Sequence, residues 1–134
     1  MEAPEAMSST QIIPYIFYSD VPAALEWLAR AFGFTEEMRD ATPGGGMHAQ
    51  MTFDGQRIMM GQGGEAWGML SPRKAGAATQ GVFIYLADVD AHHARACAAE
   101  AEIVDPPREH SYGRSYTARD LDGHSWFFTT PPPR

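Results

Sequence analysis

The sequence predicts an α+β fold of two tandem βαβββ units, which form an open, cup-shaped mixed sheet with helices outside. Two pairs of matching segments support this prediction. YSDVPA (18–23) matches LADVDA (86–91), and FDGQRIMM (53–60) matches LDGHSWFF (121–128). Asp20 and Asp88 are 68 residues apart, and so are Asp54 and Asp122. A repeat with a constant offset indicates two copies of one unit, and each copy is too small to bury its sheet alone.

The first unit spans residues 11–61. QIIPYIFYS (11–19) is rich in β-branched and aromatic residues, which predicts a strand. Asp20 is an expected helix N-cap, and apolar residues at helical spacing predict a helix over 21–32 that ends at Gly33. Three short strands are expected next, at about 34–40, 47–53 and 56–61.

The second unit, 80–130, follows a glycine-containing connection at 62–79. Asp88 is its expected N-cap, before an alanine-rich helix over 89–101. Its strands are expected at 81–87, 102–109, 114–119 and 124–129. Both units form a single domain over 11–130. A flexible N-terminal tail (1–10) and a Pro-rich tail (131–134) flank this domain.

Composition limits the classes of function. The chain has 134 residues with 44% hydrophobic content, which predicts one folded domain with a core. A net charge of −7 argues against nucleic acid as a partner, because such binders need a basic face. Cys97 is the only cysteine, so an internal disulfide is impossible and a cytoplasmic location is expected. No apolar stretch is long enough for a spanning helix, so no membrane partner is expected.

Three features together resemble the vicinal-oxygen-chelate superfamily, which includes glyoxalase I, bleomycin-resistance proteins, fosfomycin-resistance enzymes and extradiol dioxygenases. They are the strand–Asp–helix–Gly-Phe start (IIPYIFYSDVPAALEWLARAFGF), the RDLDGHSWFF end and the 68-residue repeat. The resemblance covers about residues 11–130. It implies the cup-shaped fold and a homodimer in which two chains complete two pockets, but the fold alone does not identify the reaction.

Metal-dependent members of this superfamily carry a His or Gln seven residues before the helix-capping Asp. They carry a Glu four residues after the turn Gly. The matching positions here are Ile13, Gly81, Met59 and Phe127. None supplies a nitrogen or oxygen ligand, whereas a divalent ion needs several. The expectation is therefore no metal and no cofactor, as in the metal-free bleomycin-resistance-like members.

Strand alternation predicts which side chains face the cup. The expected ligand-binding set is aromatic with a polar minority: Tyr15, Phe17, Met59, Phe83, Tyr85 and Phe127, with His48, Gln50, Arg57 and Tyr116. Tyr116 is included because the 68-residue offset carries His48 onto it. Trp67, in the connection, is expected as a further contact. Aromatic walls with a few polar groups are typical of a pocket for a flat, apolar molecule. The other interpretation is that these aromatic residues are simply core.

Three functions follow from these observations. The favoured one is a metal-free binding protein that sequesters an aromatic or apolar small molecule, such as an antibiotic, without catalysis. The alternative is a glyoxalase/dioxygenase-like enzyme, a lyase or oxidoreductase, with displaced metal ligands or with His48 or Tyr116 as catalytic group. The third is an interaction module whose inner face is a dimer surface.

The remaining candidate residues are expected to be structural. His92 and His93 are assigned to a solvated helix face, and Cys97 to a packed position on the same helix. His124 is expected to point away from the cup.

Overall fold

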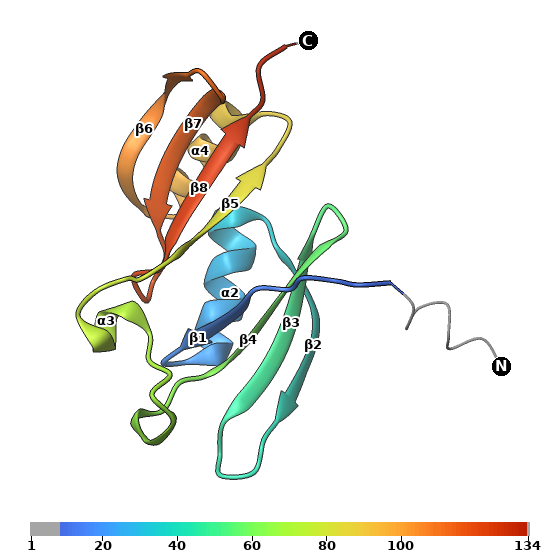
Figure 1. Ribbon diagram of the computed structural model, residues 1–134, viewed down its shortest axis with the longest axis vertical. Helices are drawn as coiled ribbons and strands as arrows, with labels where there is room; N and C mark the ends of the chain where they lie inside the picture. Colours follow the sequence, from blue (N-terminus) through green and yellow to red (C-terminus); the bar gives the residue numbers. More distant parts are fainter. Residues whose placement is uncertain (1–8, 134) are drawn as a thin grey trace, which may run out of the picture.

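A computed structural model of the chain describes residues 9–133. Most of the expected N-terminal tail (1–10), and the last residue of the expected Pro-rich tail, lie outside the described residues. The described chain forms two βαβββ units, which confirms the predicted fold class. Figure 1 shows the sheet of the first unit in its lower half and that of the second in its upper half, with helix α2 between them.

The first unit forms a four-stranded sheet in the order β1-β4-β3-β2. Strand β1 is parallel to β4, and the other neighbours are antiparallel. Its elements are β1 (Tyr15–Tyr18), α2 (Val21–Phe32), β2 (Thr35–Ala41), β3 (Met47–Phe53) and β4 (Gln56–Gln62). Only β1 differs clearly from its expected range, 11–19. It begins after Pro14, which has no N–H group to donate to a ladder.

The second unit repeats this sheet in the order β5-β8-β7-β6. Its elements are β5 (Gly81–Tyr85), α4 (Val89–Ala98), β6 (Glu102–His110), β7 (Gly113–Arg119) and β8 (Ser125–Thr130). Helix α4 ends before the expected residue 101, because the chain reverses through Glu100 at a φ of 63°. The connection carries two short helices that were not expected, η1 (Glu65–Trp67) and α3 (Pro72–Ala75).

The two main helices begin as the sequence predicts. The Asp20 carboxylate accepts a hydrogen bond from the Ala23 N–H at 3.1 Å, and Asp88 accepts one from Ala91 at 3.0 Å. Each bond satisfies one of the N–H groups that a helix start leaves without a partner. Among residues 9–133, no helix is both long and apolar enough to cross a membrane.

One continuous core joins the two units. The Phe32 ring, at the end of α2, lies 5.5 Å from the Trp126 ring and 4.8 Å from the Phe128 ring, measured between centroids. Arg95 of α4 donates hydrogen bonds to the Ala29 and Arg30 carbonyls at 2.9 and 3.0 Å. These carbonyls belong to the last turn of α2, where a helix carries partial negative charge. The helices of both units are therefore held against each other.

A buried carboxylate provides a second link between the units. Asp120, in the β7–β8 loop, is 2% exposed, and its Oδ2 accepts from the Tyr18 hydroxyl at 2.7 Å and from the Trp126 indole at 3.0 Å. Its Oδ1 accepts the backbone N–H groups of Asp122 and His124. The RDLDGH segment is therefore more than a turn, since it fixes the end of β1 to the second unit.

His92 does not lie on a solvated helix face, so that expectation is wrong. Its side chain is buried between α2 and β7, because α4 packs this face of the helix against the core. The Nε2 atom lies 2.8 Å from the Phe32 carbonyl oxygen, and Nδ1 lies 2.6 Å from the Tyr116 hydroxyl. A carbonyl only accepts, so Nε2 carries the proton and Nδ1 accepts from Tyr116.

Candidate functional site

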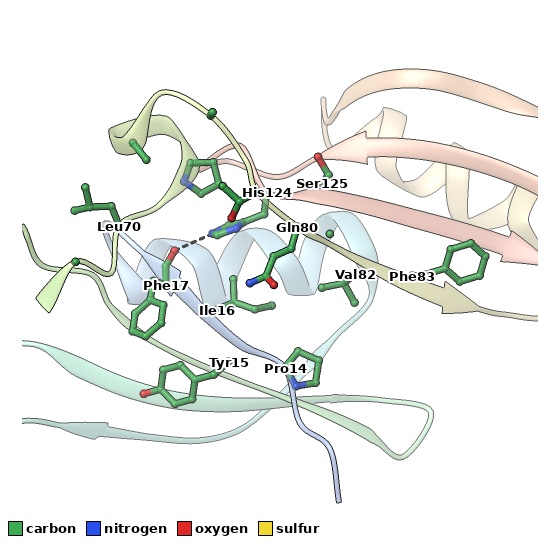
Figure 2. Close-up of a pocket in the computed structure, with 16 residues that line it drawn as sticks. Pro14, Tyr15, Ile16, Phe17, Leu70, Gln80, Val82, Phe83, His124 and Ser125 are labelled. Carbon is green, nitrogen blue, oxygen red and sulfur yellow. Dashed lines mark hydrogen bonds between the residues drawn. The ribbon is translucent and has the colours of Figure 1, made fainter.

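The face of the first sheet that lies away from helix α2, called its open face, carries a group of predicted site residues. Tyr15, Phe17 and Met59 lie on this face, because Tyr15 and Met59 are register partners and Phe17 is two residues further along β1. The Tyr15 and Phe17 ring centroids are 5.1 Å apart. In Figure 2, both rings point to one side of β1 and Ile16 points to the other. Ile16 is buried in the core, so alternation predicted these orientations correctly.

A glycine beneath Tyr15 allows its ring to reach His48. The Tyr15 hydroxyl and the His48 Nδ1 atom are hydrogen-bonded at 2.9 Å. A Cβ atom at Gly61 would lie 2.7 Å from the Tyr15 hydroxyl oxygen, which is closer than van der Waals contact permits. Gly61 is the register partner of both Phe17 and His48, so it lies in the sheet directly beneath the hydrogen-bonded Tyr15 and His48 side chains.

We expect Gly61→Ala to displace the Tyr15 ring and break its hydrogen bond to His48. Because the clash involves the end of a flexible side chain, the free energy of unfolding should fall by no more than about 1 kcal/mol. Nitrogen chemical shifts of the His48 imidazole would report the loss of the bond. Gly64→Ala is the matched control, since its added Cβ would find no atom closer than 3.6 Å. Unchanged His48 shifts in Gly61→Ala would contradict this expectation.

The two other polar residues predicted for this face are also present. Arg57 makes a two-point ion pair with Glu37 of β2, at 2.8 and 3.0 Å. These hydrogen bonds lower the pKa of Glu37 from its ordinary value. Gln50 is the register partner of Met59 and is partly buried. The charge of Arg57 is thus already balanced within the protein.

The corresponding face of the second sheet is more aromatic. Phe83 is the register partner of Phe127, and their ring centroids lie 6.5 Å apart. Phe83 also lies 5.1 Å from Tyr85 and 6.1 Å from Tyr112. Gly81 makes room for Phe127, because a Cβ atom there would lie 2.6 Å from that ring. Each sheet therefore has one glycine that accommodates a large side chain on its open face.

A pocket of about 660 Å³ lies at the seam between the two units. It is bounded by β1, by β5 and by the connection that carries α3 (Figure 2). Three of the predicted site residues line it, namely Tyr15, Phe17 and Phe83. His48, Gln50, Arg57, Met59, Tyr85 and Phe127 do not line it and lie on the open sheet faces instead.

His124 also lines this pocket, and its ring packs edge-on against the buried Tyr18, away from the open sheet face that carries Tyr15 and Phe17. Its Nε2 atom lies 2.8 Å from the Phe17 carbonyl oxygen, as the dashed line in Figure 2 shows. The carbonyl is an acceptor, so Nε2 carries the proton and Nδ1 is the acceptor in the neutral ring. The β7–β8 loop folds back across β1, which turns the ring toward the seam.

Tyr116 does not face the open side of the sheet, so its predicted place in the site is wrong. It is 1% exposed and stacks on Phe128 in the core. The repeat equivalent of Gly61 is Thr129, which pairs with Ser115, whereas Tyr116 pairs with Phe128. Strand β7 is therefore shifted by one residue relative to β3. A shift of one residue exchanges the two faces of a strand.

The cause of this shift is the length of a turn. Met51 of β3, which the 68-residue offset carries onto Arg119, pairs with Ile58 of β4, so six residues separate this pair. Strands β7 and β8 are joined by five residues, since Arg119 pairs with Ser125. The 68-residue offset therefore holds for β5 and β8 but not for β7.

Two further expectations also need correction. Trp67, in the short helix η1, does not line the pocket and is 67% exposed. Cys97 is exposed rather than packed, and its Sγ atom lies 3.3 Å from the His93 Nε2 atom. It lies on the side of α4 that faces away from the core.

The residues present do not fit the metal that related proteins use. Strand register places Met59 beside Tyr15 and Phe127 beside Phe83, while Gly81 begins β5. Together with Ile13, these positions offer one thioether sulfur and no imidazole or carboxylate. Within the described part of the chain, no group of three or more His, Cys, Asp or Glu side chains is arranged to hold a metal ion.

Sequence reasoning missed four residues of this region, for different reasons. Tyr112 lies in the β6–β7 turn, where strand alternation cannot assign a face. His124 lies in the β7–β8 loop, and only its position inside the repeated hairpin signalled it. Gln80 and Leu70 also line the pocket from the connection, where the sequence has no periodicity.

Comparisons with known proteins agree with this architecture. A family model described as the glyoxalase/bleomycin resistance protein/dioxygenase superfamily matches residues 9–128. Rv0887c, an uncharacterized protein of Mycobacterium tuberculosis, is 26% identical over 126 residues, which cover 88% of this chain and 72% of that protein.

Solved structures extend the comparison. TioX from Micromonospora sp. ML1 is 32% identical with a TM-score of 0.71, covering 93% of this chain and 98% of TioX. TnmS3, an antibiotic binding protein from Streptomyces sp. CB03234, has a TM-score of 0.74 at 17% identity. That alignment covers 92% of this chain and 98% of TnmS3, and at such low identity it shows a shared fold alone.

Proposed function

Because this chain belongs to the glyoxalase/bleomycin resistance protein/dioxygenase superfamily, we propose that it binds and sequesters an aromatic or apolar small molecule. The ligand is held at the open sheet faces and the seam pocket, without a metal and without chemical change. An antibiotic is the class of ligand that this proposal favours, since the fold is shared with an antibiotic binding protein. Membership of the superfamily does not by itself identify the ligand, because one fold can carry many functions.

The observation that carries the proposal is the exposure of large aromatic side chains on the open faces. Tyr15, Phe83 and Tyr85 are 43%, 48% and 59% exposed. The opposite faces already supply a complete core, so these rings are not needed to bury the helices. Clustered exposed aromatic rings of this kind mark ligand or partner surfaces. Stacking on each ring contributes on the order of 1 kcal/mol beyond area burial.

A second copy of the chain is part of the proposal. The open face of each sheet provides one wall of aromatic side chains, and these side chains are left exposed in the single chain. We infer that two chains pair so that each completes the other's site, and that the protein acts in the cytoplasm, where its single thiol stays reduced. Light scattering across a concentration series tests the pairing, and a monomer that still binds ligand would remove this part of the proposal.

Titration with phenazine, a neutral planar tricycle, tests binding directly. We expect Phe83→Ala to weaken phenazine binding about tenfold, because it removes one stacking face and its apolar area. Trp67→Ala is the matched control, since it removes an exposed ring outside the pocket, and it should bind as the parent protein does. Calorimetry is the suitable readout, because it measures phenazine affinity in the same way for the parent protein and for both variants.

Three results would overturn the proposal. One tightly held divalent ion per chain, in protein purified without chelator, would exclude the metal-free form. Equal phenazine affinity in the parent and in Phe83→Ala would misplace the site. No binding to phenazine, flavone and similar compounds would favour a surface that serves only association between chains.

One feature favours an enzyme as the second candidate. The hydrogen bond between Tyr15 and His48 joins two groups that can exchange a proton. A catalyst would convert its bound ligand, and His48→Gln would abolish that conversion while leaving binding largely intact. A ligand recovered unchanged after prolonged incubation supports sequestration instead.

A further inference from the structure

The seam pocket lies between two strand edges that have no strand beside them. Strand β1 is an edge strand of the first sheet, and β5 is an edge strand of the second. Residues 14–17 line one side of the pocket, and residues 80–83 line the other. An edge strand presents N–H and C=O groups that require partners.

Hydrogen bonds to β4 and to the residue after it define which backbone groups of β1 face the pocket. The Pro14 and Tyr18 carbonyls accept from Met59 and Gly63, so they point toward β4. Backbone groups of successive strand residues point to opposite sides. Tyr15 and Phe17 therefore direct their N–H and C=O groups away from β4, toward the seam. Consistent with this, the Phe17 carbonyl accepts the hydrogen bond from His124.

Strand β5 has the same arrangement. The Leu86 N–H donates to the Thr129 carbonyl of β8 at 2.9 Å. Residues 82 and 84 share this orientation, so Gly81 and Phe83 direct their backbone groups toward the seam. Within residues 9–133, no backbone hydrogen bond joins the outward groups of Tyr15, Phe17, Gly81 or Phe83 to another segment.

The pocket lining has no formal charge. Of the described residues that line it, none is Asp, Glu, Lys or Arg. Its polar side chains are the amide of Gln80, the hydroxyls of Tyr15, Thr79 and Ser125, and the imidazole of His124. A charged guest would lose its hydration without a compensating partner, so this lining selects a neutral molecule. Its volume lies within the range of small-molecule sites.

We propose that the seam pocket recognises a neutral, amide-bearing aromatic molecule, such as a blocked or cyclic peptide-like compound. Its amide groups pair with the outward backbone groups of β1 and β5, apart from the Phe17 carbonyl that accepts from His124, as an added strand pairs with a sheet edge. Its aromatic groups contact Tyr15, Phe17 and Phe83, which flank these edges. This inference rests on the proposed binding function and specifies the chemistry of the ligand.

Two synthetic probes test the amide pairing. The first is N-acetyl-Phe-Phe-amide, and the second is the same molecule with its central amide replaced by an ester. We expect the ester to bind about fivefold more weakly, because it loses one N–H donor and weakens the adjoining acceptor. Equal affinities for the amide and the ester, or no binding of the amide, would overturn the inference. That outcome would leave phenazine binding unaffected. The amide and ester probes therefore test the further inference, while phenazine tests the proposed function independently.

Hydrogen exchange locates the pairing along the strands. The N–H groups of Tyr15, Phe17 and Phe83 should exchange quickly in the free protein and slow at least tenfold with the amide probe bound. Ile16 and Ile84 are internal controls, because their N–H groups point into the sheets and should already be protected. Protection of the first three in the absence of probe would overturn the inference, since another part of the chain or a second copy would then cover the edges.

A variant that fills the pocket gives an independent test. Ala77 lines the pocket and is exposed, whereas its neighbour Ala78 is exposed but does not line it. We expect Ala77→Trp to weaken binding of the amide probe tenfold or more, and Ala78→Trp to have no effect. Equal effects of the two substitutions would contradict the assignment of the probe to this pocket.

Discussion

Asp120→Ala is expected to lower the free energy of unfolding by about 3–4 kcal/mol. The substitution leaves the Tyr18 hydroxyl, the Trp126 indole and two backbone N–H groups without their common acceptor. A buried donor without a partner costs about 1–3 kcal/mol, and partial entry of water offsets some of the total. Urea denaturation monitored by circular dichroism measures the change.

Two further variants refine the result for Asp120. Tyr18→Phe removes one donor and retains the carboxylate, so we expect a loss of about 1 kcal/mol. Asp40→Ala makes the same substitution at an exposed aspartate and should change stability by less than about 0.5 kcal/mol. A loss below about 1 kcal/mol for Asp120→Ala would show that the carboxylate does not hold the units together.

His92→Phe is expected to cost about 2–3 kcal/mol at pH 8. The phenyl ring retains most of the packing against Phe32 and Phe128. It leaves the Tyr116 hydroxyl and the Phe32 carbonyl without partners in a buried place. Thermal or urea unfolding at pH 8 provides the reference measurement.

The same pair of proteins should respond differently to acid. Burial lowers the pKa of His92, and the nearby charge of Arg95 adds to this effect, although the hydrogen bond to Phe32 opposes it. Between that lowered pKa and the ordinary value of about 6.5, only the unfolded state binds the proton. The stability of the parent protein is therefore complete above pH 6.5 and decreases as the pH falls below it. His92→Phe lacks this decrease, so the two stabilities should converge between pH 8 and pH 5. Parallel curves would contradict the assignment.

Local sequence signals predicted the repeated elements well. Asp20, Asp88 and Asp54-Gly55 each fix a helix start or a tight turn through contacts within a few residues. The parallel pairing of β1 with β4 and of β5 with β8 keeps the 68-residue offset, so the faces of Tyr15 and Phe83 could be predicted. These features depend on short-range geometry that a sequence states directly.

Long-range contacts explain what the sequence did not reveal. The burial of His92 depends on α2, which is far away in the chain, and Asp120 acquires its partners only when the two units meet. The seam pocket likewise requires both edges and the connection to be in place. No periodicity within one unit encodes contacts between two units.

The five-residue β7–β8 turn has a consequence for how duplicated proteins diverge. A change of one in strand register reassigns every side chain of β7 in a single event, without any substitution in the strand. One half of a duplicated protein can thus lose the residues on the open face of its sheet, while the other half keeps them. Libraries that aim at new specificities in this scaffold should therefore vary loop length as well as residue identity.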